Sequence, residues 1–366
     1  MEKSRVKIKS GKIIEYMEKL KPEIDEVIKR YIPKQATEEW LEFTFGIPYY
    51  VYNQSVAQKT IIEPIWDFLE RGGKRWRPIL FLLIVEAVGG DKEKLKDFVV
   101  IPEIIHNGSI IIDDIEDKAE LRRGKLCLHK IFGQDIAVNA GNIMYFLPFL
   151  SLIKNKDKFE PKILIRAYET CIQEMINIHF GQGIDIYWHK GKVKQIDEKE
   201  YLQMCAFKTG CLARMSAKLA VILSGASSEL AEKIGRVAEA IGIAFQIQDD
   251  ILDIKLQDKE REKFGKAFGN DIKEGKRTLM VIHTLKNANK RDKRRLIEIL
   301  DMHTDDKDLK KEAIEIINKY DSINYAKKIA SQIIEQSWLE ASKLLPDSPA
   351  KERLKEFVYY LIERRI

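Results

Sequence analysis

Apolar residues recur at helical spacing along the long middle part of the chain. Proline interrupts helices, and all ten prolines lie at or before Pro161 or at Pro346 and Pro349. This pattern predicts an all-α protein. The predicted helices span residues 55–70, 77–88, 92–118, 136–154, 160–189, 196–223, 227–254 and 275–287, and several shorter helices rich in Lys and Glu follow them.

Two segments need a separate interpretation. Tyr49 to Tyr52 resembles a strand, but four residues are too few to establish one. Residues 136–153 carry no formal charge and approach the length of a membrane span. Because the same segment contains Asn, Gly and Pro, a buried core helix is favoured, and we expect no transmembrane segment.

The composition is that of a globular protein with a large core. Hydrophobic residues make up 45% of the chain, and 63 Lys and Arg against 57 Asp and Glu leave a net charge of +6. This charge is too small for 366 residues to indicate nucleic-acid binding by itself. The KRDKRR segment near Asp292 admits a nucleic-acid patch as a second interpretation, but interleaved acidic residues favour a solvated outer layer of helices.

The cysteines indicate a reducing compartment. Cys127, Cys171, Cys205 and Cys211 show neither CxxC spacing nor a small disulfide framework, so we expect free thiols. The N-terminus is charged where a signal peptide needs an apolar run, which points to the cytoplasm. We find no repeat and no low-complexity linker that would place a domain boundary.

A carboxylate cluster, Asp113-Asp114-Ile115-Glu116-Asp117, follows an apolar run. On a helix, Asp113, Asp114 and Asp117 project from one face because they lie three and four residues apart. Like charges at this spacing repel, so a cation should compensate them. Oxygen ligands without His or Cys suit Mg²⁺. An acidic helix end that faces solvent is the alternative.

The same DDxxD pattern recurs at Asp249, Asp250 and Asp253, again after an apolar run. We expect the two helix faces to oppose each other across a cavity. Such a negative cavity is tolerable only with several divalent cations, which would bind a highly anionic ligand. Diphosphate is the natural candidate.

Basic residues support an anionic ligand. Arg71, Lys74, Arg75 and Arg77 cluster in the segment RGGKRWRP, where two glycines allow a tight turn before a helix. A nucleotide P-loop is excluded because GxxxxGK[ST] is absent. The pair Arg122-Arg123 directly follows the first acidic cluster. A solvated basic loop is the alternative for each cluster taken alone.

These motifs together resemble the trans-isoprenyl diphosphate synthases, and within them most closely the geranylgeranyl diphosphate synthases. The matching segments run from about Phe68 to Thr278 and are GGKRWRP, DDIEDKAELRRG, GQGIDIYW, KTG, FQIQDDILD and GNDIKEGKRT. The resemblance implies a single large helical bundle with a central active-site cavity over residues 51–366, preceded by a helical extension at 1–50. It also implies a homodimer, Mg²⁺ as cofactor, and head-to-tail condensation of isopentenyl diphosphate with dimethylallyl, geranyl or farnesyl diphosphate.

The resemblance also implies roles for individual residues. The metal ligands are Asp113, Asp114, Asp117, Asp249, Asp250 and Asp253. The site for isopentenyl diphosphate contains Lys74, Arg77, His106 and Arg123. The allylic diphosphate is held by Arg122, Lys208, Lys276 and Lys266, with Gln182 and Asp185 as a polar pair beside the metals. The groups that face the allylic cation are Lys208, Thr209 and Gln246.

The chemistry of these roles follows from the residue types. A carbon–oxygen bond to diphosphate ionises only if the leaving anion is stabilised as it forms, and metal ions and fixed cations supply this stabilisation. Thr209-Gly210 interrupts a helical run and is expected to kink it, which would free backbone carbonyls to face the cation. An ordinary helix glycine is the alternative. No isolated His or Glu suggests itself as the final base, and the resemblance implies that the released diphosphate takes the proton.

Product length should depend on where an apolar tunnel closes. Gly108 and Ser109 stand where short-product relatives commonly carry aromatic residues, so the upper tunnel is expected to be open. Tyr145, Phe146 and His179 resemble the deeper floor of geranylgeranyl diphosphate synthases. Plain core packing is the alternative for these aromatic residues.

Other functions are compatible with parts of this pattern. A farnesyl or longer-chain synthase would share every motif. A terpene cyclase would share the first acidic motif, but DDILD and GGKRWRP disfavour it. A catalytically silent partner subunit would share the fold, but the intact aspartates, Lys208 and Gln246 argue against it.

Overall fold

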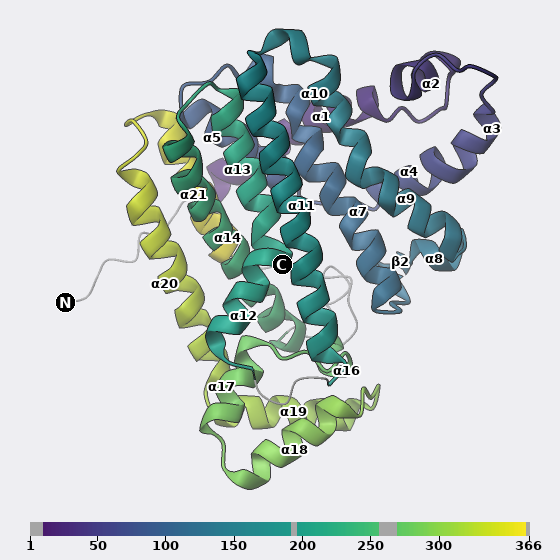
Figure 1. Ribbon diagram of the computed structural model, residues 1–366. Helices are drawn as coiled ribbons and strands as arrows, with labels where there is room; N and C mark the ends of the chain where they lie inside the picture. Colours follow the sequence, from purple (N-terminus) through teal and green to yellow (C-terminus); the bar gives the residue numbers. More distant parts are fainter. Residues whose placement is uncertain (1–9, 192–195, 256–268, 364–366) are drawn as a thin grey trace. The chain divides into compact units, whose positions relative to one another are not determined.

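The computed structural model describes residues 10–191, 196–255 and 269–363, and the chain is helical through most of them (Figure 1). The helices before residue 160 are α1 (Ser10–Tyr31), α2 (Glu38–Phe45), α3 (Gln54–Ala57), α4 (Glu63–Glu70), α5 (Trp76–Ala87), α6 (Lys92–Leu95), α7 (Val100–Glu116), α8 (Leu128–Ile131), α9 (Gln134–Phe146) and α10 (Leu150–Lys154). The later helices are α11 (Pro161–His189), α12 (Glu198–Cys205), α13 (Cys211–Leu223), α14 (Ser228–Lys255), α16 (Asn270–Lys273), α17 (Leu279–Asn287), α18 (Lys290–Asp301), α19 (Lys307–Lys319), α20 (Ser322–Ser342) and α21 (Pro349–Glu363). The prediction of an all-α protein is confirmed.

Several of these helices are joined by short turns of different pitch. The 3₁₀ turns are η2 (Lys96–Val99), η3 (Leu147–Phe149) and η4 (Lys156–Lys158), and the π-helical turns are η1 (Gln58–Ile62) and η5 (Ala206–Gly210). Predicted helix 275–287 begins only at Leu279, because Gly275 has a φ of 70° and the side chain of Thr278 caps the first turn.

The strand-like run at Tyr49–Tyr52 forms no strand. The only strands in the described ranges are β1 (Leu121–Arg122) and β2 (Lys125–Leu126), which form a small antiparallel hairpin. Its two turn residues, Arg123 and Gly124, have φ values of 53° and 76°. Two positive φ angles are typical of the tight type I′ turn, so this hairpin is a local feature of the RRG sequence.

The described residues form two compact units. The first lies within residues 1–169, 216–231 and 347–354, and the second within 170–215, 232–346 and 355–366. Each unit is described below by itself. The division at residue 50 that the resemblance implies stays a prediction.

Helix α5 forms the centre of the first unit. Apart from Arg77 and Glu86 its residues are apolar, and Phe81, Leu83 and Val85 are completely buried, as expected for a helix enclosed by others. Helices α7 and α9 approach each other closely at Gly108 and Gly141. A Cβ atom on Gly108 would lie 2.9 Å from the carbonyl oxygen of Gly141. Glycine is therefore needed at this position for the two backbones to meet.

The uncharged segment around α9 and α10 is also part of the first unit. Residues 134–154 are long and apolar enough to span a membrane, but half of the most apolar window is buried inside the protein. Pro148 and the 3₁₀ turn η3 interrupt the helix in its middle. These observations favour the predicted core helix over a membrane span.

The second unit contains a close packing of α11, η5 and α14. A Cβ atom on Gly181 would lie 2.3 Å from the backbone nitrogen of Lys208, and one on Gly242 would lie 2.6 Å from the Cα of Gly210. These two glycines allow the neighbouring helices to touch the π turn directly. The interruption predicted at Thr209-Gly210 is thus observed as a π turn, a feature often found at functional sites.

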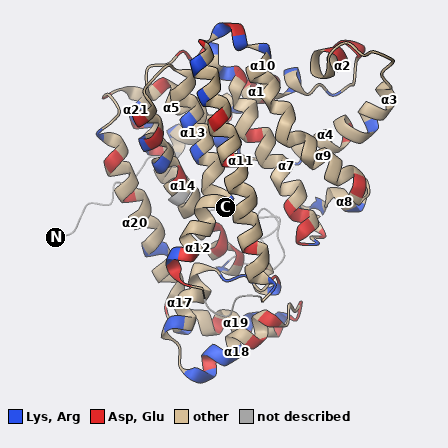
Figure 2. Cartoon of the chain, in the orientation of Figure 1, with Lys and Arg blue, Asp and Glu red and all other residues tan. Residues whose placement is uncertain are grey.

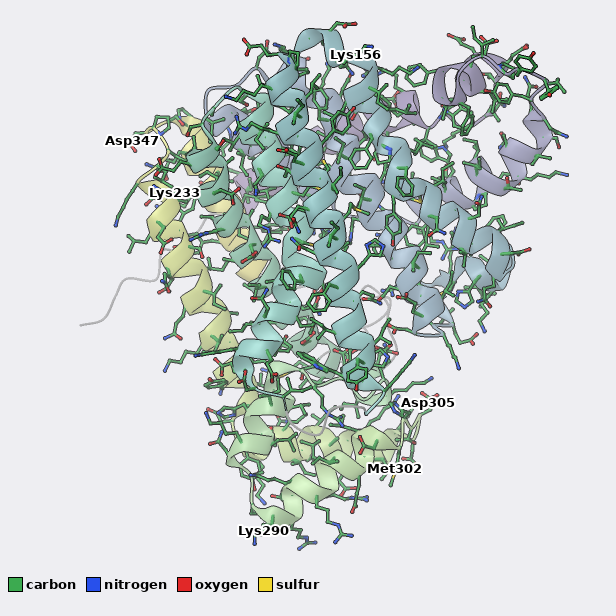
Figure 3. The ribbon with its side chains drawn as sticks, viewed as in Figure 1. Lys156, Lys233, Lys290, Met302, Asp305 and Asp347 are labelled. Atoms are coloured by element: carbon green, nitrogen blue, oxygen red, sulfur yellow. The ribbon has the colours of Figure 1, made fainter. Side chains whose placement is uncertain are left out.

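Helices α18 and α19 of the second unit carry the charged KRDKRR and DDKDLKKE segments. Both helices carry positive and negative residues (Figure 2), and Figure 3 labels Lys290 at the start of α18 and Met302 directly after its end. Arg295 is held by Glu312 through two contacts of 2.7 Å, and Lys319 lies 2.7 Å from Asp292. Because these cations are neutralised locally, the surface fits the solvated layer expected from the sequence rather than a basic patch.

Candidate active site

The basic loop of the first unit has an unusual backbone. Gly72 and Gly73 have φ values of 92° and 141°, and Arg75 has a φ of 50° although it carries a side chain. Arg75 immediately precedes α5, whose first turn contains Arg77. A left-handed residue other than glycine costs free energy and is kept only where the surroundings fix it, which is common at functional sites.

The surroundings of Arg77 are fixed as well. Its side chain is 4% exposed and its guanidinium lies 4.2 Å from the centre of the Trp76 ring. The hydroxyl of Ser216 donates a 2.8 Å hydrogen bond to the backbone carbonyl of Arg77. In contrast, the neighbouring Lys74 is exposed to solvent.

The hairpin turn brings Arg123 to the same loop. Its guanidinium donates to the carbonyl of Gly72 and, at 3.4 Å, to the side-chain oxygen of Asn107. The ring of Phe68 lies 5.1 Å from the guanidinium of Arg123 and 5.7 Å from that of Arg71. Residues from α4, α7 and the hairpin thus form one cationic cluster.

His106 of α7 belongs to this cluster. Burial and the neighbouring arginines, with Arg77 the strongest, hold the pKa of His106 well below its usual value. The pKa of the Arg123 guanidinium is lowered to about 10, mainly because it is buried. Burial is the main cause of both shifts, and repulsion from neighbouring arginines lowers each pKa further. An anionic ligand would relieve this repulsion.

The first aspartate motif lies at the end of α7. The Nε atom of Arg122 donates a 2.7 Å hydrogen bond to Asp114 Oδ1, and its Nη2 atom lies 3.4 Å from Asp113 Oδ2. Asp114 is 1% exposed, so burial raises its pKa, although Arg122 opposes this change. Burial and Asp114 also raise the pKa of the Cys127 thiol to about 12. Arg122 therefore enters the carboxylate face, which is predicted from the sequence to bind a metal ion, because the tight hairpin turns its side chain back toward the end of α7.

The second aspartate motif lies near the end of α14 in the second unit. Asp250 accepts a 2.7 Å hydrogen bond from the hydroxyl of Tyr201 and a 2.8 Å bond from the amide of Gln246. The oxygen of the Gln246 side chain accepts a 2.8 Å bond from the hydroxyl of Thr209. Burial and the charge of Asp271 raise the pKa of Asp250 to about 8. Burial thus disfavours the charged form of this carboxyl group.

The two other aspartates of this motif differ in exposure. Asp253 is 3% exposed, and its Oδ2 atom accepts a 3.0 Å hydrogen bond from the backbone nitrogen of Asp271. Asp249 is only half-buried. The motif therefore has a solvent-accessible member and two buried members that are hydrogen-bonded to the surrounding protein.

Lys208 of the π turn contacts α11. Its Nζ atom lies 2.5 Å from Asp185 Oδ2. Burial tends to raise the pKa of Asp185, but Lys208 and Lys276 outweigh this effect and lower it. Lys276 also pairs with Glu274 and lies 3.6 Å from Asp271. Gln182, one turn before Asp185 on α11, is half-buried.

The predicted tunnel residues lie in different environments. Gly108 is buried against α9, so its small size serves helix packing. Ser109 donates a 2.9 Å bond to the carbonyl of His106. Tyr145 is 8% exposed, whereas Phe146 is 71% exposed, and His179 is also exposed and contacts the carbonyl of Met175. Of the predicted floor residues, only Tyr145 is buried within the chain.

The carboxylates fit a hard metal ion such as Mg²⁺ better than a soft one. Their oxygen atoms are the preferred ligands of Mg²⁺, and the buried Oδ2 atom of Asp114 accepts no hydrogen bond from the residues described. Within residues 10–191, 196–255 and 269–363, no three His, Cys, Asp or Glu side chains converge on one point as a metal cage. Mg²⁺ typically takes one or two carboxylates and completes its shell with water and phosphate oxygens.

One predicted site residue cannot be placed, and four residues that support the site were not predicted. Lys266 lies outside the described residues. Sequence reasoning missed Asp25, Glu103, Asn107 and Tyr201, which hold Arg75, Arg123 and Asp250 in place. Glu103 and Asn107 precede the first aspartate motif on α7 at helical spacing, a signal that was available. Asp25 lies far from any motif in sequence, and Tyr201, which precedes the KTG segment, belongs to none of the motifs.

Comparisons with known proteins identify the family. Residues 58–317 match the model of the polyprenyl synthetase family. A short chain isoprenyl diphosphate synthase of Methanocaldococcus jannaschii is 32% identical over 282 residues, which cover 77% of this chain and 76% of that protein. A geranylgeranyl diphosphate synthase of Methanosarcina mazei is 35% identical over 222 residues, or 61% of this chain and 66% of that protein. The chain belongs to the polyprenyl synthetase family.

A solved structure supports the same assignment. Geranylgeranyl pyrophosphate synthetase from Pyrococcus horikoshii Ot3 has a TM-score of 0.83 and 31% sequence identity, covering 98% of this chain and all of that one. The predictions of the fold class and of a trans-prenyltransferase of isoprenoid biosynthesis are confirmed. The roles of individual residues and the opposition of the two aspartate motifs stay predictions.

Proposed function

We propose that this prenyltransferase condenses isopentenyl diphosphate with an allylic diphosphate, head to tail and in trans, to make geranylgeranyl diphosphate. The observation that supports the substrates most directly is the group of four arginines of the first unit, Arg75, Arg77, Arg122 and Arg123, around the buried ring of His106. Several guanidinium groups gathered at one place suit a ligand of several negative charges. The product length is suggested by the names of the relatives and by the buried Tyr145.

We assign separate groups of residues to the two diphosphate substrates. We assign isopentenyl diphosphate to Lys74, Arg77, His106 and Arg123. Lys74 is exposed and Arg77 is buried, so the two side chains would meet the ligand from the solvent side and from the protein side of the loop. His106 accepts or donates hydrogen bonds as a neutral ring at neutral pH. These side chains orient the homoallylic substrate and do not ionise it.

The aspartate motifs are assigned to Mg²⁺. Asp113, Asp114 and Asp117 in the first unit and Asp249, Asp250 and Asp253 in the second would hold the ions. When bound, Mg²⁺ neutralises charge that develops on the departing diphosphate. Arg122 and Lys276, with Lys208, add fixed positive charge for the same anion. In this structure these cations already neutralise Asp114, Asp185 and Glu274, so ligand binding would exchange carboxylate partners for phosphate oxygens.

The π turn serves the allylic cation in this proposal. Its hydroxyl group, Thr209, is fixed through Gln246, which is fixed in turn by Asp250. A π turn leaves backbone carbonyls out of the regular helical pattern, and carbonyl oxygens carry the partial negative charge that a carbocation needs. The released diphosphate then takes the proton from the condensed product.

We also propose that the enzyme is a homodimer. Ile172, Ile176 and Phe180 of α11 are 57%, 59% and 61% exposed and lie four residues apart, so they form one apolar stripe. A second copy of the chain would cover this stripe. Sedimentation velocity should show a dimer, and Ile176→Lys should shift it toward monomer. A monomeric unaltered protein at micromolar concentration would contradict this proposal.

The reaction is tested by incubating purified protein with Mg²⁺, isopentenyl diphosphate and farnesyl diphosphate, followed by chromatography of the products. We expect a C20 diphosphate and release of diphosphate. A catalytically silent partner subunit would release none. A cyclase would make hydrocarbon from the allylic substrate without isopentenyl diphosphate. A product shorter or longer than C20 would reject the assigned chain length but keep the reaction.

A further inference from the structure

A network of side chains connects the N-terminal helix to the basic cluster of the first unit. Arg75 is 5% exposed and makes three contacts with its guanidinium group. Its Nε atom donates to Asp25 Oδ1 at 2.9 Å, its Nη1 atom donates to Glu103 Oε1 at 2.9 Å, and its Nη2 atom donates to the carbonyl of Leu69 at 3.2 Å. Arg75 is thereby occupied by protein partners, so its role differs from that of Lys74 and Arg77.

The same network reaches Arg123. Glu103 Oε1 accepts a second hydrogen bond, of 2.9 Å, from the amide of Asn107. The amide oxygen of Asn107 accepts from Arg123, which also donates to the carbonyl of Gly72. Asp25 is thus the first member of a chain that runs through Arg75, Glu103 and Asn107 to a cation assigned to isopentenyl diphosphate.

The backbone explains why this network matters. Arg75 and Arg123 are both left-handed, with φ values of 50° and 53°. Such a conformation is unfavourable for a residue with a side chain and persists only when contacts hold it. A Cβ atom on Gly73 would lie only 3.0 Å from Arg75 Nη1, so the loop is wrapped tightly over this guanidinium. If Arg75 moved, Lys74 and Arg77 on either side would move with it.

The buried positive charge of Arg75 also needs the carboxylate partners of this network. Burial disfavours the Arg75 cation, but Glu103 and Asp25 outweigh that effect and raise its pKa. The carboxylates of Asp25 and Glu103 therefore offset the positive charge of Arg75, which lies among other cations that repel it. Asp25 lies in α1, before the start of the family match at residue 58. Family resemblance over residues 58–317 could not have assigned it a role.

We propose that Asp25 is a positioning residue for the isopentenyl diphosphate site. Together with Glu103 it fixes Arg75 in its left-handed conformation, and this sets Lys74 and Arg77 directly and Arg123 through Asn107. The inference rests on the proposed function, because it concerns the ligand assigned to that cluster. It predicts that a substitution of Asp25 in α1 weakens the binding of isopentenyl diphosphate and leaves the binding of the allylic substrate unchanged.

The test compares Asp25→Asn with Asp97→Asn. Asp97 anchors the same helix through Arg30, at 2.9 Å, and through the hydroxyl of Tyr31, at 3.2 Å, but it does not touch Arg75. We expect Asp25→Asn to raise the KM for isopentenyl diphosphate about tenfold, the usual scale for one charged hydrogen bond. The KM for the allylic substrate and kcat should stay within about twofold. Asp25→Glu should recover part of the loss.

A binding measurement separates this inference from the proposed function. Calorimetric titration with isopentenyl diphosphate alone should show the same weakening for Asp25→Asn and none for Asp97→Asn. Equal affinity in the unaltered protein and Asp25→Asn would overturn the positioning role. Equal losses in both variants would overturn it too, because they would mean that Asp25 only tethers α1. An unaltered protein that neither binds isopentenyl diphosphate nor makes product would reject the proposed function itself.

Discussion

The two aspartate motifs share the pattern DDxxD but have different surroundings. In the first unit, Asp113 and Asp114 contact the guanidinium of Arg122, a permanent cation. In the second unit, Asp250 accepts hydrogen bonds from Tyr201 and Gln246, which are neutral. The carboxylates of the first motif are therefore held by an ion pair, whereas Asp250 of the second motif is held by hydrogen bonds from neutral donors.

This difference shows that a sequence motif does not determine its own charge. Burial and Asp271 raise the pKa of Asp250 to about 8, because the neutral donors cannot offset the loss of solvation. Burial also raises the pKa of Asp114, but Arg122 opposes the change.

The largest expected effect is the loss of one aspartate from either motif. Asp113→Ala and Asp249→Ala should each lower kcat by about 10²-fold or more, the scale on which single groups stabilise developing charge. Circular dichroism should show intact helical content in both. Near-normal turnover in one variant would show that its motif does not take part in catalysis and that only the other motif does.

The next effect concerns the π turn η5, which is linked by hydrogen bonds to the second motif. Gly181→Ala would place a Cβ atom 2.3 Å from the backbone of Lys208, so it should displace Lys208 and lower kcat by about tenfold or more. Gly183→Ala on the same helix is the matched control, because its Cβ would meet nothing within 4 Å. That control should be neutral or slightly stabilising, since Ala favours helices by about 0.5–1 kcal/mol over Gly. Equal activities in the two variants would show that the contact at Gly181 is unimportant.

A smaller effect concerns the product formed near the first motif. Tyr145→Ala should remove a buried ring and lengthen the product by at least one isoprene unit in part of the mixture. Phe146→Ala removes a side chain that is 71% exposed, so it should matter less unless a second copy of the chain covers it. Chromatography of products from both single variants and the double variant separates these contributions. An unchanged distribution in all three would place the floor elsewhere.

The smallest effect is the pH dependence of stability without metal. The pKa of Asp250 is raised in the folded state, so this state binds more protons than the unfolded chain between roughly pH 4 and 8. The contribution of Asp250 to stability is thus present at low pH and is lost as the pH rises toward 8. Asp250→Asn should remove this loss and melt higher than the unaltered protein in EDTA at pH 8.5. Identical melting curves at pH 6 and 8.5 for both proteins would contradict the raised pKa.

Much of this protein could be predicted from local sequence. The proline-free middle and the apolar spacing indicated the helices correctly, because helix formation depends on contacts three and four residues apart. The beginning of α17 was misplaced because the cap at Thr278 and the left-handed Gly275 depend on the following turn. The hairpin at Leu121–Leu126 was missed because a four-residue ladder has too little periodicity to detect.

The sequence by itself determined the helical class, the family and the residue types of the candidate site, because spacing along a helix and local chemistry are written in neighbouring residues. Only the tertiary structure decided which partners those residues have: Tyr201 for Asp250, Asp185 for Lys208, and Asp25 for Arg75. These partners are 49, 23 and 50 residues away in sequence. Contacts at such separations depend on packing between helices, and packing sets the burial and the charge that each functional group experiences.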